Sequence, residues 1–255
     1  MVRGVRAVAA ALLVMGVLTA CGSPEPPGVR PVVLGQVPHD PSAFTQGLEL
    51  APGGGALYEG TGLVGRSQLR ELDPATGALR RSVPVPNDWF GEGITVSGDR
   101  IWQLTWTDGV ALEWDRATFR LLRTVPMSGE GWGLCHDGNR LVRSDGSARL
   151  RFQDPSTFAE TGGVDVTENG APVTNLNELE CVGGQVWANV WQSDRIVRID
   201  PATGQVTAAV DASGLLTPEQ RQGADVLNGI AALGGDEYLL TGKLWPTMFR
   251  VRLPA

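Results

Sequence analysis

The chain has 255 residues, a formal net charge of −7 at pH 7, three cysteines and two histidines. An acidic balance without any basic run argues against nucleic acid as a partner. So few histidines and cysteines leave no cluster that could bind zinc in the usual geometry.

The chain begins with the features of an export signal. Arg3 and Arg6 precede an apolar run from Ala7 to Ala20. This run is shorter than the roughly 18–20 residues that span a bilayer, and it is typical of a signal peptide. We therefore expect residues 1–20 to be a signal peptide and the protein to be exported.

The signal peptide ends in a motif typical of bacterial lipoproteins. The sequence LTAC at residues 18–21 resembles a lipobox, in which the cysteine becomes the first mature residue and carries lipid. We expect a lipidated Cys21, a Pro/Gly-rich tether over residues 21–30, and a monomer on the extracytoplasmic face of a cell-envelope membrane. The lipid is then the only membrane contact. The alternative is an ordinary signal peptide with an incidental cysteine.

Residues 31–255 contain a repeat of about 45 residues. Each unit has a short apolar strand, a Gly-rich turn and a second strand with alternating apolar residues. A third strand ends in Asp and a tight turn, as in ELDPATG and RIDPATG, where Asp accepts backbone N–H bonds and Gly tolerates positive φ. A fourth strand follows. The leading residues of the units, which lie 46, 40, 45 and 51 residues apart, are Gln46, Glu92, Trp132, Asn177 and Asn228.

Four strands in about 45 residues are typical of a propeller blade. We therefore predict an all-β, five-bladed β-propeller with four-stranded blades over residues 31–255. The fifth unit lacks an outer strand, and the N-terminal segment RPVVLGQVP can supply it and close the ring. One helix is predicted near residues 215–224, where Thr217 and Gln220 form a capping box.

Two cysteines remain besides Cys21. Cys135 and Cys181 would meet an oxidising compartment after export, where disulfides form. The sequence does not place them within bonding distance of each other. A disulfide and a pair of buried free thiols therefore both remain open.

Two enzyme motifs are unsupported. Gly60, Gly62 and Gly65 match G-x-G-x-x-G, which binds dinucleotides when a strand precedes it and a helix follows. A strand and a turn follow here, so nucleotide binding is not expected. No G-x-S-x-G motif occurs, so an esterase with that nucleophile is unsupported as well.

The leading residues predict a pocket at the mouth of the central channel, where the innermost strands begin. Trp106, Trp191 and Lys243 end the second strands, and antiparallel pairing places those ends beside the starts of the first strands. Trp114 and Trp187 are instead expected to pack between blades. We predict a pocket in which indoles, with Trp102 and Trp106 among the nearest, surround Glu92. Such a site suits a small molecule or a chain end.

Short motifs in series, spanning residues 35–253, resemble the plant and bacterial type of glutaminyl-peptide cyclotransferase. In chain order they are FTQG (Phe44, Gln46), FGEG (Phe90, Glu92), LTW (Trp106), GWGL (Trp132), LNELE (Asn177), NVW (Trp191), and LNGIA followed by TGKLWP (Lys243). The resemblance implies a five-bladed propeller, as the repeat does. It also implies conversion of an N-terminal glutamine to pyroglutamate with release of ammonia. The animal enzyme of the same name has an unrelated zinc-dependent fold.

The resemblance assigns roles residue by residue. Glu92 corresponds to the family's essential glutamate, and Asn177 and Lys243 to its polar partners. The residues that correspond to the pocket lining are Phe44, Gln46, Phe90, Trp106, Trp132 and Trp191. The partners implied are peptides or proteins with an N-terminal glutamine. No cofactor is required, and a structural metal on the propeller axis is compatible with the sequence.

The implied chemistry suits these residues. The substrate's own amine attacks its own side-chain carbonyl, so the enzyme has only to hold the conformer and move protons. Glu92 can serve as base and then acid, and Lys243 or Asn177 can stabilise the oxyanion. Taken alone, Lys243 could instead be a surface charge and Asn177 a turn residue.

Two rival functions are open. The first is a non-catalytic propeller lipoprotein that binds peptides in the cell envelope. The second is a lactonase-like hydrolase, which needs several inward carboxylates around an axial calcium. Besides Glu92, the sequence offers only Glu178 and Glu180 for that role.

Overall fold

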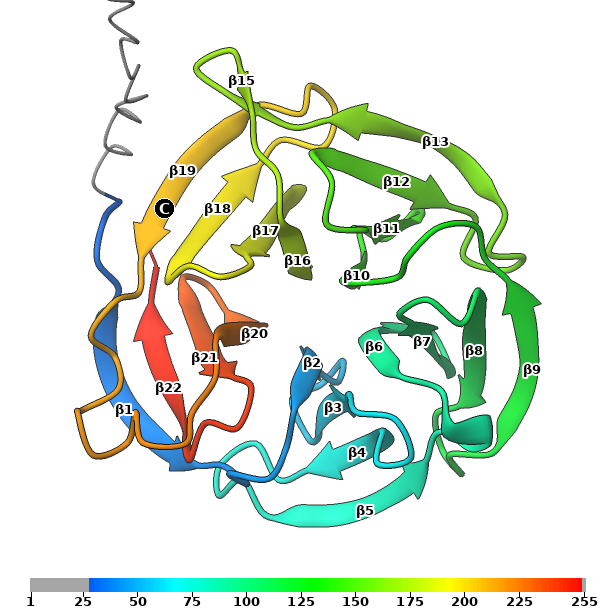
Figure 1. The fold of residues 1–255 in the computed structure, drawn as a ribbon, viewed down its shortest axis with the longest axis horizontal. Helices are drawn as coiled ribbons and strands as arrows, with labels where there is room; N and C mark the ends of the chain where they lie inside the picture. The colour runs from blue at the N-terminus through cyan, green and yellow to red at the C-terminus, as the bar shows by residue number, and fades with distance from the viewer. Residues whose placement is uncertain (1–27, 254–255) are drawn as a thin grey trace, which may run out of the picture.

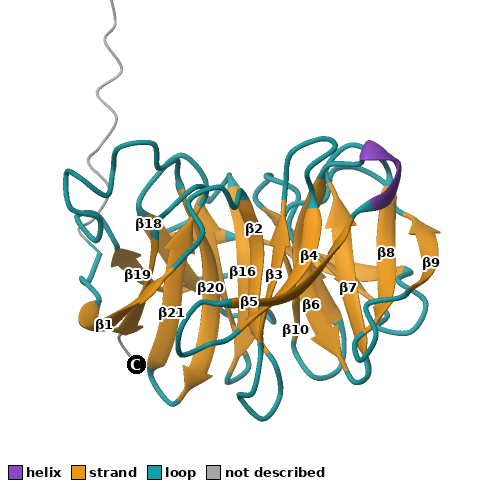
Figure 2. Cartoon of the chain, turned by 90° about the horizontal axis from the view of Figure 1, so that it is seen from below, coloured by secondary structure: helices purple, strands orange, loops and turns teal. Residues whose placement is uncertain are grey.

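The computed structural model describes residues 28–253. The predicted signal peptide, Cys21 and most of the tether lie outside this range. Within it, five four-stranded antiparallel sheets stand around a common axis, as Figure 1 shows. Seen from the side in Figure 2, the strands run between two faces that carry the loops. The predicted all-β, five-bladed propeller is confirmed.

The strands of each blade are given in order from the axis outward. Blade 1 has β2 (Thr45–Leu50), β3 (Leu57–Thr61), β4 (Gln68–Leu72) and β5 (Leu79–Pro84). Blade 2 has β6 (Gly91–Ser97), β7 (Arg100–Thr105), β8 (Val110–Asp115) and β9 (Leu121–Pro126). Blade 3 has β10 (Leu134–His136), β11 (Leu141–Arg143), β12 (Arg149–Gln153) and β13 (Glu160–Asp165). Blade 4 has β16 (Leu176–Val182), β17 (Gln185–Val190), β18 (Arg195–Ile199) and β19 (Val206–Asp211). Blade 5 has β20 (Leu227–Gly234), β21 (Glu237–Gly242), β22 (Thr247–Arg252) and the N-terminal β1 (Val32–Pro38).

The ring closes with strands from both ends of the chain. β1 pairs antiparallel with β22, from Val32 opposite Arg252 to Pro38 opposite Thr247 (Figure 1). The prediction that the N-terminal segment completes blade 5 is therefore confirmed. This pairing satisfies backbone groups that β22 would otherwise expose at an edge.

The repeated Asp turns form as the sequence predicts. In blade 1 the Asp73 carboxylate accepts hydrogen bonds from the N–H groups of Ala75 and Thr76, each at 2.9 Å. Gly77 closes the turn with a φ of 70°. A Cβ there would come within 1.9 Å of the Pro38 carbonyl oxygen, so only glycine fits.

The predicted helix near residues 215–224 was wrong. Its capping box does form, because Thr217 N donates to Gln220 Oε1 at 3.0 Å and Gln220 N donates to Thr217 Oγ1 at 3.3 Å. A single turn follows, closed by a bond from Arg221 N to Thr217 O, and Gly223 then adopts a φ of 84°. One turn is too short to propagate a helix. Within residues 28–253 the helical structure is limited to one 3₁₀ turn (Pro86–Asp88), and no helix is long and apolar enough to cross a membrane.

Tryptophans fill much of the space between blades. Trp114 and Trp187 are each 2% exposed, as expected for blade packing. Trp102, which we expected near Glu92, is also fully buried. It stacks on Phe158 with ring centroids 4.9 Å apart and donates from Nε1 to the Pro155 carbonyl. Its position in the middle of β7 keeps it away from the channel mouth.

A disulfide joins two neighbouring inner strands. Cys135 on β10 is bonded to Cys181 on β16, with Cα atoms 5.4 Å apart. Both residues lie with the core side chains between blades 3 and 4. The structure thus decides in favour of the disulfide.

The remaining secondary structure is minor. A two-stranded hairpin, β14 (Thr167–Glu168) and β15 (Ala171–Pro172), lies between blades 3 and 4. The glycine pattern at residues 60–65 runs from the end of β3 into the turn before β4, so a strand follows it, as predicted, in place of the helix that a dinucleotide site needs.

Candidate active site

The inner strands begin with bulges. The pairing of β6 with β7 slips between Gly91 and Ile94, which leaves Glu92 outside the regular ladder. The same irregularity occurs at the leading residue of three other blades, namely at Gln46, Asn177 and Asn228. A bulge bends a strand and re-aims the side chain of the extra residue. The repeat therefore turns its leading side chains toward the channel mouth.

Glycines let the inner strands approach closely. Gly93 and Gly133 each follow a leading residue. A Cβ at Gly93 would lie 2.6 Å from the Trp132 carbonyl oxygen, and one at Gly133 would lie 2.0 Å from the Asn177 carbonyl oxygen. Larger residues at these positions would push the blades apart.

Blade 4 places a carboxylate where other blades have this glycine. Glu178 is 1% exposed and accepts hydrogen bonds from Leu48 N at 3.2 Å and Ile230 N at 2.9 Å. Burial raises its pKa well above the usual range. Its two oxygens are thus engaged with backbone groups of blades 1 and 5, which does not suit the lactonase-like arrangement of carboxylates around an axial ion.

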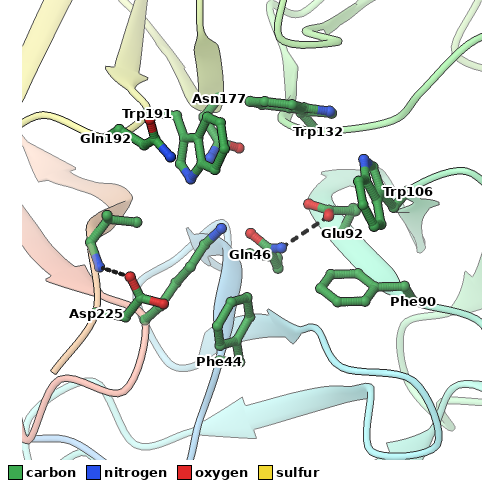
Figure 3. Close-up of a pocket in the computed structure, with 12 residues that line it drawn as sticks. Phe44, Gln46, Phe90, Glu92, Trp106, Trp132, Asn177, Trp191, Gln192 and Asp225 are labelled. Atoms are coloured by element: carbon green, nitrogen blue, oxygen red, sulfur yellow. Dashed lines mark hydrogen bonds between the residues drawn. The ribbon is translucent and has the colours of Figure 1, made fainter. Parts of the chain in front are cut away.

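A pocket of about 410 Å³ opens at this mouth. Figure 3 shows its lining residues, which converge from several blades. The residues that the sequence predicted for the site, all of which line the pocket, are Phe44, Gln46, Phe90, Glu92, Trp106, Trp132, Asn177, Trp191 and Lys243. The structure adds Gln192, Asp225 and Val226, which sequence reasoning missed.

A relay of amides fixes the Glu92 carboxylate. Asn228 Nδ2 donates to the Thr45 carbonyl at 2.9 Å and to Gln46 Oε1 at 3.2 Å. Gln46 in turn donates from Nε2 to Glu92 Oε1 at 2.9 Å (Figure 3). Since its own oxygen already accepts a bond, Gln46 must present its amide N–H to Glu92. The carboxylate is therefore oriented by blades 5 and 1.

Glu92 and Lys243 are both buried and shift each other's pKa. Glu92 is 4% exposed, and burial raises its pKa well above the usual range. Lys243 opposes this effect, whereas Glu130 adds to it. Burial in turn lowers the pKa of Lys243, against the pull of Glu92 and Asp225. Burial therefore favours the neutral form of each group, while their mutual attraction favours the charged forms.

Asn177 brings an unused acceptor. It is 2% exposed, and its side-chain Oδ1 is buried without a hydrogen-bond partner among the described residues. Buried polar atoms are usually paired, so an unpaired one in a pocket points to a ligand group. Asn177 is also held in place through its backbone, because Ser144 Oγ donates to its carbonyl at 2.6 Å.

Aromatic rings wall the pocket on two sides. Phe90 contacts Phe44 and Trp106 edge to face, with centroids 6.1 Å and 5.6 Å apart. Trp132 and Trp191 form a second edge-to-face pair at 5.3 Å. The Lys243 ammonium lies 4.9 Å from the Phe44 ring centroid, a cation–π distance. Trp106 is 42% exposed and marks the rim of the pocket.

Comparison with known proteins shows the family to which the chain belongs. A family model described as glutamine cyclotransferase matches residues 7–253. The chain belongs to the glutamine cyclotransferase family. It is 41% identical over 228 residues to a curated glutaminyl-peptide cyclotransferase from Arabidopsis thaliana, which covers 87% of this chain and 70% of that protein. The crystal structure of Myxococcus xanthus glutaminyl cyclase matches with a TM-score of 0.78 and 41% identity, over 88% of this chain and 97% of that chain.

One of the three pocket residues that the sequence analysis missed, Val226, follows a simple spacing. Val226 lies two residues before the leading Asn228, as Phe44 and Phe90 lie two residues before Gln46 and Glu92. The position two before the leading residue therefore lines the pocket in blades 1, 2 and 5.

The other two missed residues, Gln192 and Asp225, are neighbours of residues already in the pocket. No three His, Cys, Asp or Glu side chains within residues 28–253 of this family member are arranged to hold a metal ion.

Proposed function

We propose that the protein converts the N-terminal glutamine of peptides and proteins to pyroglutamate and releases ammonia. The observation that carries the proposal is a buried carboxylate, Glu92, held by Gln46 in a small aromatic pocket opposite Lys243. The names of the similar plant and Myxococcus proteins support the same activity.

The pocket favours a chain end over a continuing chain. Its volume of about 410 Å³ is at the small end for ligand sites. The aromatic walls can confine a glutamine side chain in a folded conformer, so that the α-amine lies against the side-chain carbonyl. Holding that conformer removes much of the entropic barrier to closing a five-membered ring.

Glu92 is the proposed proton shuttle. As the bond between the α-nitrogen and Cδ forms, the carboxylate takes a proton from the amine. It then gives this proton to the side-chain nitrogen, so that the bond between Cδ and that nitrogen breaks and ammonia leaves. A free α-amine has a pKa of about 8, and a base whose pKa is raised toward that value transfers the proton more readily. Burial of Glu92 provides this shift.

Lys243 and Asn177 are proposed to bind the substrate polar groups. The Lys243 ammonium lines the pocket and can stabilise the developing oxyanion. Asn177 Oδ1, which has no hydrogen-bond partner within residues 28–253, is an acceptor for an N–H group of the substrate. We propose no cofactor for these steps.

The proposed setting is the cell envelope. The lipobox at Cys21, the signal peptide of residues 1–20 and the tether of residues 21–30 would hold a monomeric propeller on the extracytoplasmic face of a membrane. Its substrates would be exported or surface peptides with an N-terminal glutamine.

The test is ammonia release from matched peptides. A peptide that begins with glutamine should lose one ammonia and gain a blocked N-terminus, whereas the same peptide that begins with asparagine should stay intact. The non-catalytic alternative predicts binding without any ammonia. Binding alone, with no turnover over a range of pH, would overturn the proposal in favour of a peptide-binding lipoprotein.

A further inference from the structure

Glu130 takes no part in the chemistry proposed above, yet two of the pocket indoles depend on it. Trp106 donates from Nε1 to Glu130 Oε2 at 2.7 Å. Trp132 donates from Nε1 to the same oxygen at 2.8 Å. Trp106 follows β7 in blade 2 and Trp132 precedes β10 in blade 3, so one carboxylate oxygen joins two blades across the pocket wall.

Glu130 occupies the repeat position that lines the pocket in blades 1, 2 and 5. It lies two residues before the leading Trp132, where blades 1 and 2 place Phe44 and Phe90. Those phenylalanines form the wall directly. Blade 3 places an acid there instead, and this acid is the hydrogen-bond acceptor that the two neighbouring indoles require.

The backbone around Glu130 is held rigidly. Arg143, which is 1% exposed, donates from Nη1 to the carbonyl oxygens of Ser128 and Glu130, each at 3.1 Å. Gly131 N donates to the Trp106 carbonyl at 2.9 Å. The carboxylate is therefore presented from a fixed loop, as a group that positions other side chains must be.

We propose that Glu130 is a positioning residue that holds the Trp106 and Trp132 indoles in the substrate-binding wall through a single carboxylate oxygen. The inference rests on the proposed cyclase function, because it assigns a role within that site. An indole without its acceptor is free to rotate, most of all Trp106, which is 42% exposed.

The charge of Glu130 has a second consequence. The charged groups that act on Glu92 are Lys243, which lowers its pKa, and Glu130, which raises it, both after the larger effect of burial. Removing the charge of Glu130 alone should therefore lower the pKa of Glu92. The limb of the kcat/KM profile on which Glu92 loses its proton then moves to lower pH.

Two substitutions separate the two effects. Glu130→Gln keeps a carbonyl oxygen for the indoles and removes the charge, so it should shift the acidic limb of the pH profile and leave KM nearly unchanged. Glu130→Ala also removes the acceptor, so KM should rise about tenfold or more, which is the usual effect of losing hydrogen bonds to a charged group. Glu237→Ala is the matched control, since Glu237 is a partly buried, Arg250-paired acid at the opposite end of β21 from Lys243.

Binding is measured separately from turnover. In a Glu92→Gln background, a Gln-initiated peptide is titrated while tryptophan fluorescence and acrylamide quenching are followed. Adding Glu130→Ala should weaken binding and expose tryptophan to the quencher. If Glu130→Ala does not fold, Trp106→Phe, which keeps a ring but lacks the N–H donor, should raise KM by itself.

The outcomes are distinct. A wild-type protein that never cyclises the peptide overturns the proposed function, while the quenching result still tests whether Glu130 positions the two indoles. If the wild type is a cyclase, and Glu130→Ala and Glu130→Gln leave its KM, quenching and pH profile unchanged, the positioning role of Glu130 is overturned and the proposed function is not.

Discussion

Replacing Glu92 by glutamine should remove most turnover and leave the pocket assembled. The bond from Gln46 Nε2 to position 92 can persist, because the new side-chain carbonyl accepts it as the carboxylate does. No described hydrogen bond links the aromatic walls to the atom that changes. Glutamine cannot accept and return a proton, so the change removes the shuttle, together with the charge that raises the pKa of Lys243.

The expected magnitude follows from the role. Removing a general acid–base group lowers the rate by about 10²–10⁴, which corresponds to about 3–5 kcal/mol of barrier. The free energy of unfolding should rise or stay nearly the same. Because the folded-state pKa of Glu92 is raised, the wild type is favoured when Glu92 is protonated and loses that stability as pH rises through this pKa. The neutral variant avoids that loss at and above neutral pH.

The assay measures kcat and KM on a Gln-initiated peptide beside a thermal melt at several pH values. Glu178→Gln is the control, since it makes the same change in a buried carboxylate of the channel whose hydrogen bonds among the described residues come from backbone N–H groups. One of these N–H groups loses its acceptor in the variant, so its melting temperature is measured as well. The control should retain kcat. We expect Glu92→Gln to lose kcat with little change in KM.

Three results would refute the reasoning. A well-folded Glu92→Gln variant with near-normal kcat would remove Glu92 as the shuttle. A collapse of kcat in Glu178→Gln without loss of stability would transfer that role to the channel carboxylate. A large fall in the melting temperature of Glu92→Gln would instead make Glu92 a structural residue.

Further predictions concern the pocket lysine, a buried ion pair, the disulfide and Cys21. Lys243→Met, which keeps the apolar stem, should lower kcat/KM by about 10²–10³ without lowering the melting temperature; unchanged kinetics would exclude an oxyanion role. Glu59→Gln should lower the free energy of unfolding by about 3–5 kcal/mol in urea titrations, because Glu59 forms a buried ion pair with His39 at 2.9 Å; a loss below 1 kcal/mol would contradict this. Despite burial, the pKa of Glu59 is lowered and that of His39 is raised, so this pair should stabilise the fold at intermediate pH. The Glu59 contribution is lost as pH falls through its folded pKa, and the His39 contribution is lost as pH rises through its own. Replacing both disulfide cysteines by serine should cost about 4 kcal/mol for a crosslink between residues 46 apart, and equal denaturant midpoints in oxidised and serine forms would disprove it. Cys21→Ser should release soluble, active protein from membranes, and a variant that still sediments with membranes would disprove lipidation at this residue.

The sequence by itself determined the architecture and most of the pocket. Strand pairing within a blade is local, so the spacing of Gly-rich turns and Asp turns is visible along the chain. The ring then needs an outer strand for blade 5, and the apolar segment before blade 1 supplies it. A repeated fold also brings equivalent positions to one face, which is why residues as distant as Gln46 and Lys243 were placed together.

Only the tertiary structure decided how side chains that lie close together in the sequence separate in space. Trp102 and Trp106 are four residues apart, yet the first is buried between blades 2 and 3 and the second lies at the rim. The same holds for the turn at Thr217, whose capping box is real but whose helix ends after one turn.

Distances between blades were likewise beyond the reach of a repeat pattern. The bond between Cys135 and Cys181, and the meeting of two indoles on Glu130, depend on how closely neighbouring inner strands approach. Gly93 and Gly133 set that approach by lacking a Cβ. A periodic sequence specifies which strands pair, whereas packing between blades decides which atoms touch, because that packing depends on every side chain in the interface at once.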